Sequence, residues 1–246
     1  MIDDLAITTW SHTSYSDIWN MYYGQFKKMA PFFKHYMFIN EKTLLPPDYC
    51  IQIENDETKD FGVRVVDSLQ RVKEKNIIWM QEDFVLYDKV EEEIISKLNE
   101  FLNNSNYHFI KLMKSGINGG NPLQEKLGIF EVPNNCEYLY SLQATIWKKD
   151  KLLKLYDFYK PRNMLNAELF GSVACNNLNI KGCYVYKNEP RRGRGHHDSN
   201  TFPYIATALH GGSYGKPARW QTSIYDLELN NLLNDYKIDK TIRGEV

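Results

Sequence analysis

The chain has 246 residues and a mass of 29.0 kDa; 43% of its residues are hydrophobic and 25% are charged. This length and composition are typical of a globular protein with a full hydrophobic core. The formal net charge is −1, which argues against nonspecific binding to nucleic acid or membranes. No apolar run approaches the ~20 residues that a membrane-spanning helix needs.

The four cysteines and the N-terminal sequence indicate the compartment. Cys50, Cys136, Cys175 and Cys183 show no C-x-x-C spacing, which favours free thiols over a zinc or redox site. The N-terminal sequence MIDDLAITTW is acidic and lacks the long apolar region of a signal peptide. We therefore expect a soluble, cytoplasmic protein.

The first half of the sequence alternates short apolar strands with amphipathic helices. Ser16 is expected to cap a helix that ends at Pro31, Asp60 to open a second, and Asp88 with Glu91 to form the capping box of a third. Such alternation predicts an α/β fold with a mostly parallel sheet and helices on both faces. The expected strands cover residues 5–10, 36–39, 49–53, 76–80 and 107–112.

The second half has a different pattern. Residues 136–147 form a long β-like stretch, which leads into a helix capped by Asp150. Asn166 is expected to begin the next helix, with its core-facing side given by Leu169, Phe170, Val173 and Ala174. We find no repeat and no linker, so a single domain is expected. The remaining expected features are a Gly/Asn loop at 115–124, a strand at 182–186, a basic loop at 191–200 and a helix near 226–236.

Two adjacent carboxylates interrupt apolar sequence in NIIWMQEDFVLYD, residues 76–88. Glu82 and Asp83 directly follow an expected buried strand, and the chain becomes apolar again at Phe84. Adjacent ionised carboxylates repel each other and are costly to bury, so they either face solvent or hold a cation. In α/β sheets, ligands bind at the carboxyl ends of the strands, which favours a divalent cation such as Mg²⁺ or Mn²⁺.

Other polar groups stand at equivalent strand ends. Thr8 and Thr9 end the first strand, with Ser11 and Asp17 just beyond, and Asn55 and Asp56 follow the third strand. These groups can recognise a nucleotide's base and ribose, although turn and capping roles are the better explanation of each residue taken alone. Arg64, early in a helix, either reaches a diphosphate or faces solvent.

Further candidates for chemistry lie in the second half. Glu168 lies in the expected first turn of a helix, where it either benefits from the helix dipole or serves as a general base. The basic loop RRGRGHHDSN, residues 191–200, is either a mobile cationic lid over a phosphate or a solvated loop, with a metal site at His196 and His197 as a weaker alternative. The sequence contains no G-x-S-x-G, Walker A or G-x-G-x-x-G motif at a strand–helix junction.

Several of these segments, in this order, resemble a known family. They are TTWSHTSYSDIW, VRVVDSLQRVKEKNIIWMQEDFVL, YLYSLQATIWKKDKL, AELFGS and GKPARW. The sequence is similar to GT-A nucleotide-sugar glycosyltransferases, in particular small bacterial and large-DNA-virus members such as the rhamnosyltransferase-like domains of algal viruses. The resemblance covers nearly the whole chain. It departs from the commoner pattern in having Glu82-Asp83-Phe84 in place of D-x-D, and in the interrupted GKPARW segment around Lys216.

The resemblance implies a role for each matching residue. Thr8, Thr9, Asp17 and Arg64 would frame the nucleotide of the donor, with Lys216 as a further contact. Asp83, helped by Glu82, would hold Mn²⁺ or Mg²⁺ on the diphosphate. Glu168 would be the base of an inverting transfer of a hexose or deoxyhexose to a glycan hydroxyl. Ser141 and Gln143 would line the sugar or acceptor pocket. Residues 1–114 would form the nucleotide-binding half and residues 115–246 the acceptor-binding half of one GT-A domain.

Two alternatives remain open from the sequence. The first is a module of the same fold that binds carbohydrate or nucleotide and has lost turnover. The second is a metal-dependent phosphoryl-transfer enzyme or nuclease, which would need a second acidic cluster for a two-metal site; Asp56 is one scattered candidate.

Overall fold

A computed structural model describes residues 2–210, 219–220 and 224–244. It contains one nine-stranded sheet with the strand order β3-β2-β1-β4-β8-β5-β9-β7-β6. The strands are β1 (Leu5–Trp10), β2 (Lys34–Ile39), β3 (Cys50–Glu54), β4 (Asn76–Gln81), β5 (Phe109–Lys111), β6 (Pro122–Gln124), β7 (Ile129–Glu131), β8 (Thr145–Lys148) and β9 (Gly182–Val185). A separate two-stranded ribbon pairs β10 (Leu209–His210) with β11 (Arg219–Trp220).

The sheet is mostly parallel, as the alternating sequence pattern predicts. β1 pairs in parallel with both β2 and β4, β2 does so with β3, and β5 with β9. Only β7 and β8 run against the other strands of this sheet, and β8 lies between β4 and β5. The carboxyl ends of β1 to β4 therefore meet along one edge, where polar side chains can converge.

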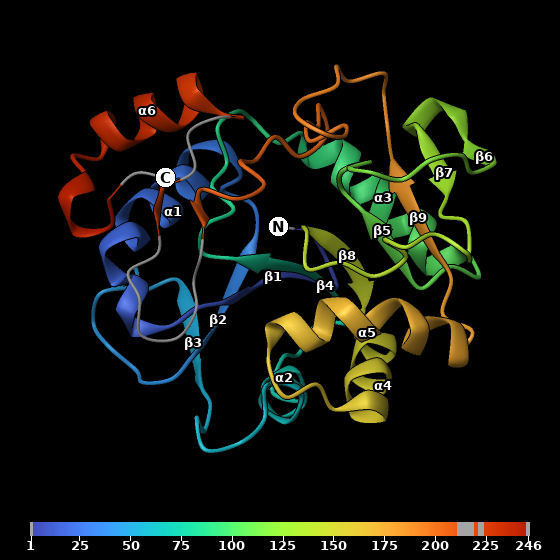
Figure 1. Cartoon of the computed structure of the whole chain (residues 1–246), viewed down its shortest axis with the longest axis horizontal. Coiled ribbons are helices and arrows are strands. Elements are labelled where there is room, and N and C mark those ends of the chain that lie inside the picture. Colours follow the sequence, from blue (N-terminus) through green and yellow to red (C-terminus); the bar gives the residue numbers. More distant parts are fainter. Residues whose placement is uncertain (1, 211–218, 221–223, 245–246) are drawn as a thin grey trace.

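Helices cover both faces of the sheet, and Figure 1 shows the layers. One face packs against α1 (Ser16–Met29), α3 (Glu92–Asn104) and α6 (Asp226–Asp235). The other packs against α2 (Phe61–Leu69), α4 (Lys149–Tyr159) and α5 (Met164–Asn177) around an aromatic core that includes Trp10, Trp79 and Trp147. Among the described residues, no helix is long and apolar enough to cross a membrane.

Several expected element boundaries are wrong. Ser16 is the first residue of α1 and does not cap it, and α3 begins at Glu92, where Asp88 accepts a hydrogen bond from the Lys89 amide outside the helix. Only Thr145–Lys148 of the β-like stretch 136–147 is a strand, because residues 136–144 are mostly turns and bends. α4 begins at Lys149, before its expected cap Asp150.

The expected inner face of α5 is also wrong for its large residues. Leu169, Phe170 and Val173 are 60, 55 and 59% exposed, whereas small residues of the helix, among them Ala167 and Gly171, are buried. Small side chains bring the helix close to its neighbours: a Cβ on Gly171 would lie 2.3 Å from Cδ1 of Tyr140. Close packing of the small residues therefore turns the large ones outward.

Candidate functional site

The Glu82-Asp83 pair lies at the carboxyl end of β4, the strand at which the parallel part of the sheet meets the antiparallel strand β8. Trp10, the last residue of β1, is paired with Gln81, so the two strands end side by side. Both carboxylates are only 8% exposed. The two carboxylates therefore do not face solvent, which was one of the two alternatives from the sequence. The alternative that they hold a cation is left as the prediction for this pair.

No ion pair reaches Glu82 or Asp83 within the described part of the chain, and the hydrogen bond found to an Asp83 carboxylate oxygen is a long one from the Leu209 amide, at 3.4 Å. Burial raises the pKa of Asp83 to about 7. Burial, and then the neighbouring Asp83, raise the pKa of Glu82 well above its usual range. Two uncompensated buried carboxylates are the environment that a hard divalent cation would neutralise.

The donor set fits such a cation. The described residues contain no group of three or more His, Cys, Asp or Glu side chains arranged to hold a metal, so a cation at this pair would take at most two of its ligands from such side chains. Mg²⁺ is commonly bound by one or two protein carboxylates, with waters and substrate phosphates filling the remaining positions. The sequence expectation for Asp83 and Glu82 thus remains consistent with the geometry.

The segment from Pro203 to Leu209 covers the acidic pair. Its backbone runs along residues 83–87: the Ile205 amide donates to the Val85 carbonyl at 2.9 Å, and the Ala208 amide to the Asp83 carbonyl at 3.2 Å. His210 follows Leu209 directly and is exposed. Sequence reasoning missed this cover, since it pairs residues more than 110 positions apart without a strand-like pattern.

Asp17 lies near the acidic pair but is bound by an arginine from the C-terminus. Arg243 Nε donates to Asp17 at 2.7 Å, a second guanidinium nitrogen also contacts this carboxylate, and the Ser14 carbonyl accepts at 2.8 Å. The Arg243 guanidinium stacks on the Tyr15 ring at 4.7 Å. Burial, followed by Glu82, raises the pKa of Tyr15, so Tyr15 and Arg243 both belong to the surroundings of the acidic pair.

Thr8 and Thr9 are fully buried, and their hydroxyls bond within the sheet layers. Thr8 Oγ1 donates to the Ile78 carbonyl at 3.3 Å, and Thr9 Oγ1 lies 2.7 Å from the Tyr22 hydroxyl. The geometry thus gives both threonines a role in holding β1 against β4 and α1.

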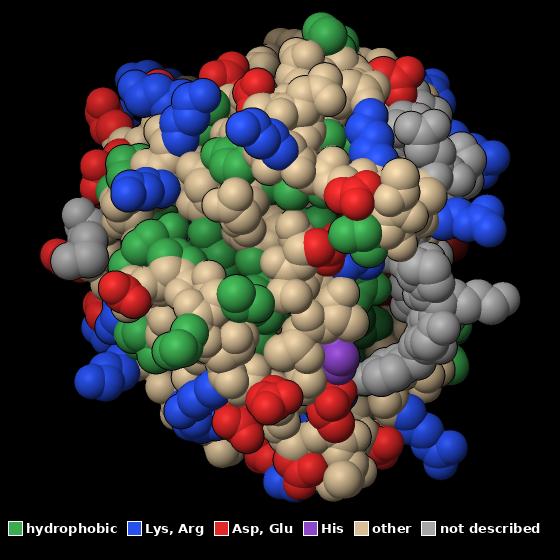
Figure 2. Space-filling model, turned by 90° about the vertical axis from the view of Figure 1, so that its left-hand side faces the viewer, with side chains coloured by type: hydrophobic (Ala, Val, Ile, Leu, Met, Phe, Trp, Pro, Cys, Tyr) green, Lys and Arg blue, Asp and Glu red, His purple; other side chains and the backbone are tan. Residues whose placement is uncertain are grey.

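Arg64 is buried beside a polar cavity at the ends of β2 and β3. Its Nε donates to Asn55 Oδ1 at 2.7 Å, its guanidinium lies 3.7 Å from Glu57, and it stacks on Trp10 at 5.0 Å. The amide nitrogen of Asn55 is buried and has no hydrogen-bond partner among the described residues. The cavity has a volume of about 480 Å³ and is lined by Asn40, Glu54, Asn55, Asp56 and Glu57. Figure 2 shows acidic side chains gathered at the lower end of this side of the molecule, toward the end of β3.

Glu168 lies on α5, one of the helices on the second face of the sheet. It is the fifth residue of the helix and not in the first turn, because α5 begins at Met164 and is capped by Asn163. The Glu168 carboxylate is exposed and accepts a hydrogen bond from the Leu142 amide at 3.2 Å. This bond fixes it against residues 136–143, at the end of the sheet where β8 begins.

Lys111 is a buried cation whose pKa is influenced by burial and by the charge of Glu168. Its Nζ donates to Ser141 Oγ at 2.7 Å, and burial lowers its pKa to about 8. Gln143, two residues on, bonds the Tyr204 hydroxyl at 3.0 Å and the Ala206 carbonyl at 3.3 Å. Gln143 thus connects the loop that holds Glu168 to the segment that covers Asp83. Sequence reasoning missed Lys111, which stands in an otherwise apolar strand, and that setting is a usable signal.

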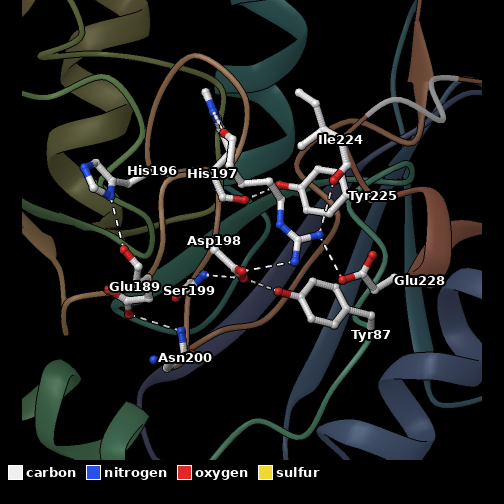
Figure 3. A network of polar contacts seen from close by, with 11 residues as sticks. Tyr87, Glu189, His196, His197, Asp198, Ser199, Asn200, Ile224, Tyr225 and Glu228 are labelled. Atoms are coloured by element: carbon white, nitrogen blue, oxygen red, sulfur yellow. Dashed lines mark hydrogen bonds and ion pairs between the residues drawn. The ribbon is translucent and has the colours of Figure 1, made fainter.

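The basic loop 191–200 is bound into a polar network, which Figure 3 shows. Arg192 forms ion pairs with Asp198 at 3.2 Å and Glu228 at 2.8 Å, and stacks on Tyr225 at 4.9 Å. The imidazoles of His196 and His197 bond main-chain carbonyl oxygens at 3.2 and 3.1 Å. Arg192 is therefore committed to pairing α6 with this loop and is not a free phosphate-binding cation. Lys216 lies outside the described residues.

The chain matches no family model and no curated protein. Its fold is similar to that of solved structures. The S. aureus TarS fragment 1–349 in complex with UDP aligns with a TM-score of 0.51 and 14% identity, covering 97% of this chain and 68% of that one. A second structure of the TarS fragment 1–349 aligns with a TM-score of 0.50 and 16% identity, and the alignment covers 83% of this chain and 60% of that one. A mannosyltransferase from Pyrobaculum calidifontis in complex with GDP-Man and Mn²⁺ aligns with a TM-score of 0.45 and 8% identity. The alignment covers 80% of this chain and 61% of that one.

The likeness to the TarS fragment confirms the fold class expected from the sequence: a single α/β domain with a large, mostly parallel, Rossmann-like sheet flanked by helices. The chain spans roughly two thirds or less of the TarS fragment in both alignments. At this level of identity the likeness concerns the fold, and the chemistry has to be argued from the residues of this chain.

Proposed function

We propose that the protein is a metal-dependent, inverting glycosyltransferase that moves a sugar from a nucleoside-diphosphate donor to a hydroxyl of a glycan. The observation that carries the proposal is the Glu82-Asp83 pair, two buried carboxylates with no ion-pair partner among the described residues, at the carboxyl end of a central parallel strand. Mn²⁺ or Mg²⁺ held there by Asp83, with Glu82 as helper, would neutralise charge on the departing diphosphate.

The donor nucleotide would bind at the ends of β1 to β3, within residues 1–114. The cavity beside Asn55 and Arg64 is large enough for part of a nucleoside, and the Asn55 amide nitrogen, which has no hydrogen-bond partner among the described residues, would donate to a base or ribose oxygen. In this arrangement Arg64 acts by orienting Asn55, since its Nε holds the Asn55 oxygen. Thr8, Thr9 and Asp17 would support the site indirectly, because their hydrogen bonds and ion pair hold β1 and α1 in position.

Glu168 would be the base of the transfer step, on the acceptor side formed by residues 115–246. The acceptor hydroxyl gives its proton to the Glu168 carboxylate while its oxygen forms a bond to the anomeric carbon of the sugar. The bond from that carbon to the diphosphate oxygen breaks on the opposite face, and the nucleoside diphosphate leaves with the electron pair. The Leu142 amide holds one carboxylate oxygen of Glu168, which leaves the other for the acceptor.

Donor binding tests the metal assignment. We expect a nucleoside diphosphate to raise the melting temperature with Mn²⁺ and to have little effect in EDTA. Asp83→Asn should abolish the Mn²⁺-dependent shift, while Asp88→Asn, the same change at an exposed position five residues on, should leave it intact. An unchanged shift in Asp83→Asn would overturn the assignment of Asp83 as a metal ligand.

A screen of nucleotide sugars for hydrolysis or transfer separates an enzyme from a silent binding module of the same fold. Release of the nucleoside diphosphate in the presence of an acceptor glycan supports the transferase. Mn²⁺-dependent donor binding without release from any donor, in the presence of a mixed acceptor glycan pool, would favour the silent module instead.

A further inference from the structure

The outer face of α5 is a patch of large hydrophobic side chains. Leu165, Leu169 and Val173 follow one another at four-residue intervals and are 63, 60 and 59% exposed, and Phe170 beside them is 55% exposed. Residues at this spacing lie on one side of a helix. Single exposed hydrophobic residues are ordinary in proteins, but several on one helix face mark an interaction surface.

α5 has the composition of a helix that is covered on both sides. Glu168 is its one charged residue between Met164 and Asn177, and its inner face consists of small residues. A helix that is apolar on two sides is normally buried on both. The inner face of α5 packs on α4 and on residues 137–142, and Figure 1 shows α5 in front of α4. Within the described residues, the outer face has no such cover.

Cations flank α5 along the chain and occur on the neighbouring helix α4. Arg162 stands two residues before α5, Lys181 four residues after it, and Lys154 projects from α4; all three are exposed and form no ion pair within the described residues. Residues 148–181 carry seven lysines and arginines against three carboxylates, although the whole chain has a net charge of −1. The apolar patch therefore belongs to a positively charged stretch of the sequence, while the rest of the chain has an excess of carboxylates.

We propose that the outer face of α5 docks the protein on an anionic lipid bilayer. The four hydrophobic side chains would enter the interface between headgroups and acyl chains, and Arg162, Lys181 and Lys154 would meet anionic headgroups. An apolar helix face flanked by cations is the pattern of helices that lie in a membrane surface. The net charge of −1 hides this, because the positive charges are concentrated in one stretch of the chain.

Charge also decides against a second copy of the chain as the occupant. A two-fold pair of α5 helices would place Arg162 and Lys181 of one copy against the same cations of the other, whichever way the helices run. Like charges at an interface oppose association, whereas an anionic surface is complementary to them.

Docking would orient the proposed active site. Glu168 lies on the same helix, next to Leu169, so a docked α5 would hold the Glu168 carboxylate close to the bilayer surface. The hydroxyl of an acceptor carried by a lipid would then lie close to the Glu168 carboxylate. This part rests on the proposed glycosyl transfer, whereas docking itself does not.

The test is co-sedimentation of the full chain with vesicles of phosphatidylcholine alone and of phosphatidylcholine with phosphatidylglycerol, without donor or metal. We expect binding to the anionic vesicles and little to the neutral ones. Leu169→Gln/Phe170→Gln should weaken binding about 100-fold, since removing each large side chain from the interface changes partitioning roughly tenfold. Arg162→Glu/Lys181→Glu should weaken it by at least about 10-fold.

The matched control is Leu44→Gln/Leu45→Gln, which removes two hydrophobic side chains that are 102 and 67% exposed elsewhere on the surface. It should bind vesicles like the unmodified protein, as should Asp83→Asn. No binding to anionic vesicles, or equal binding by the α5 variant, would overturn the proposal. A dimer in sedimentation equilibrium that the α5 variant dissociates would instead assign the face to a second copy. Loss of Mn²⁺-dependent donor binding with vesicle binding intact would contradict only the proposed function.

Discussion

The acidic pair after β4 and the outer face of α5 break the rules of burial in opposite ways. At the first, charged side chains that belong in water are buried, with 8% of Glu82 and Asp83 exposed. At the second, hydrophobic side chains that belong in a core are exposed, with Leu165 at 63%. Each arrangement costs free energy in the isolated chain. Both regions therefore point to something outside the chain, a cation at one and an apolar, anionic surface at the other.

The two regions differ in what compensates them. A point charge can be neutralised by one ion, so the acidic pair needs a small ligand and a precise geometry. A hydrophobic face is compensated by area, so α5 needs an extended partner. Substitutions in each region should accordingly affect different measurements.

The largest expected effect is on catalysis, at Glu168, which lies on the same helix as the exposed face. Glu168→Gln removes the carboxylate that would accept the proton, and we expect the turnover number to fall by about 100- to 10,000-fold. The donor-induced rise in melting temperature should stay, because the hydrogen bond of Glu168 that the described residues show is to the Leu142 amide and not to the acidic pair. Glu125→Gln, the same change at another exposed carboxylate, is the control and should retain turnover. Loss of donor binding in Glu168→Gln would identify it as a structural residue.

The next effect is on stability, at Asp83, in the absence of metal. Burial raises its pKa to about 7, against 3.8 in an unfolded chain, so the native state holds a proton that the unfolded state has lost between these pH values. The free energy of unfolding therefore falls as the pH rises from about 4 to about 7, by on the order of 4 kcal/mol. Asp83→Asn has no such proton to lose.

Urea unfolding in EDTA at a series of pH values measures this. The variant should be more stable than the unmodified protein near pH 8, and its stability should change less with pH. A variant that is less stable at every pH would show that the Asp83 carboxylate stabilises the fold. The acidic pair would then not cost free energy in the isolated chain, unlike the exposed face of α5.

Sequence periodicity was sufficient for the first region. The run Ile77-Ile78-Trp79-Met80 is apolar at every position, which identifies a strand buried on both faces, and Glu82 and Asp83 must then lie at its carboxyl end. The same reasoning located β1 from Leu5 to Trp10. It could not supply Arg243 as the partner of Asp17, because that pairing joins residues 226 positions apart.

Periodicity failed for α5 because the helix is apolar on both sides. A search for large hydrophobic residues at helical spacing selects Leu169, Phe170 and Val173, whereas the core accepts Ala167 and Gly171. Which side faces inward depends on how closely the neighbours approach, and the Tyr140 ring leaves no room for a side chain at Gly171. Such a contact is a tertiary fact that local sequence does not encode.

Gly171→Ala sharpens the contrast between the two sides of this helix. The added Cβ would lie 2.3 Å from the Tyr140 ring, so the helix or the ring has to move. We expect the free energy of unfolding to fall by about 1–3 kcal/mol despite the better helix propensity of alanine. Thermal or urea unfolding measures it, and a gain in stability would show that Tyr140 yields without cost.

The smallest expected effect is on the outer side of the same helix. Leu169 is 60% exposed, so Leu169→Gln should change the free energy of unfolding by less than about 0.5 kcal/mol. In the same variant the partitioning onto anionic vesicles should fall about tenfold, because the side chain meets apolar surroundings only in the docked state. A large loss of stability with unchanged partitioning would mean that Leu169 packs within the chain. The exposed face would then be part of the core, and only the acidic pair would call for a ligand.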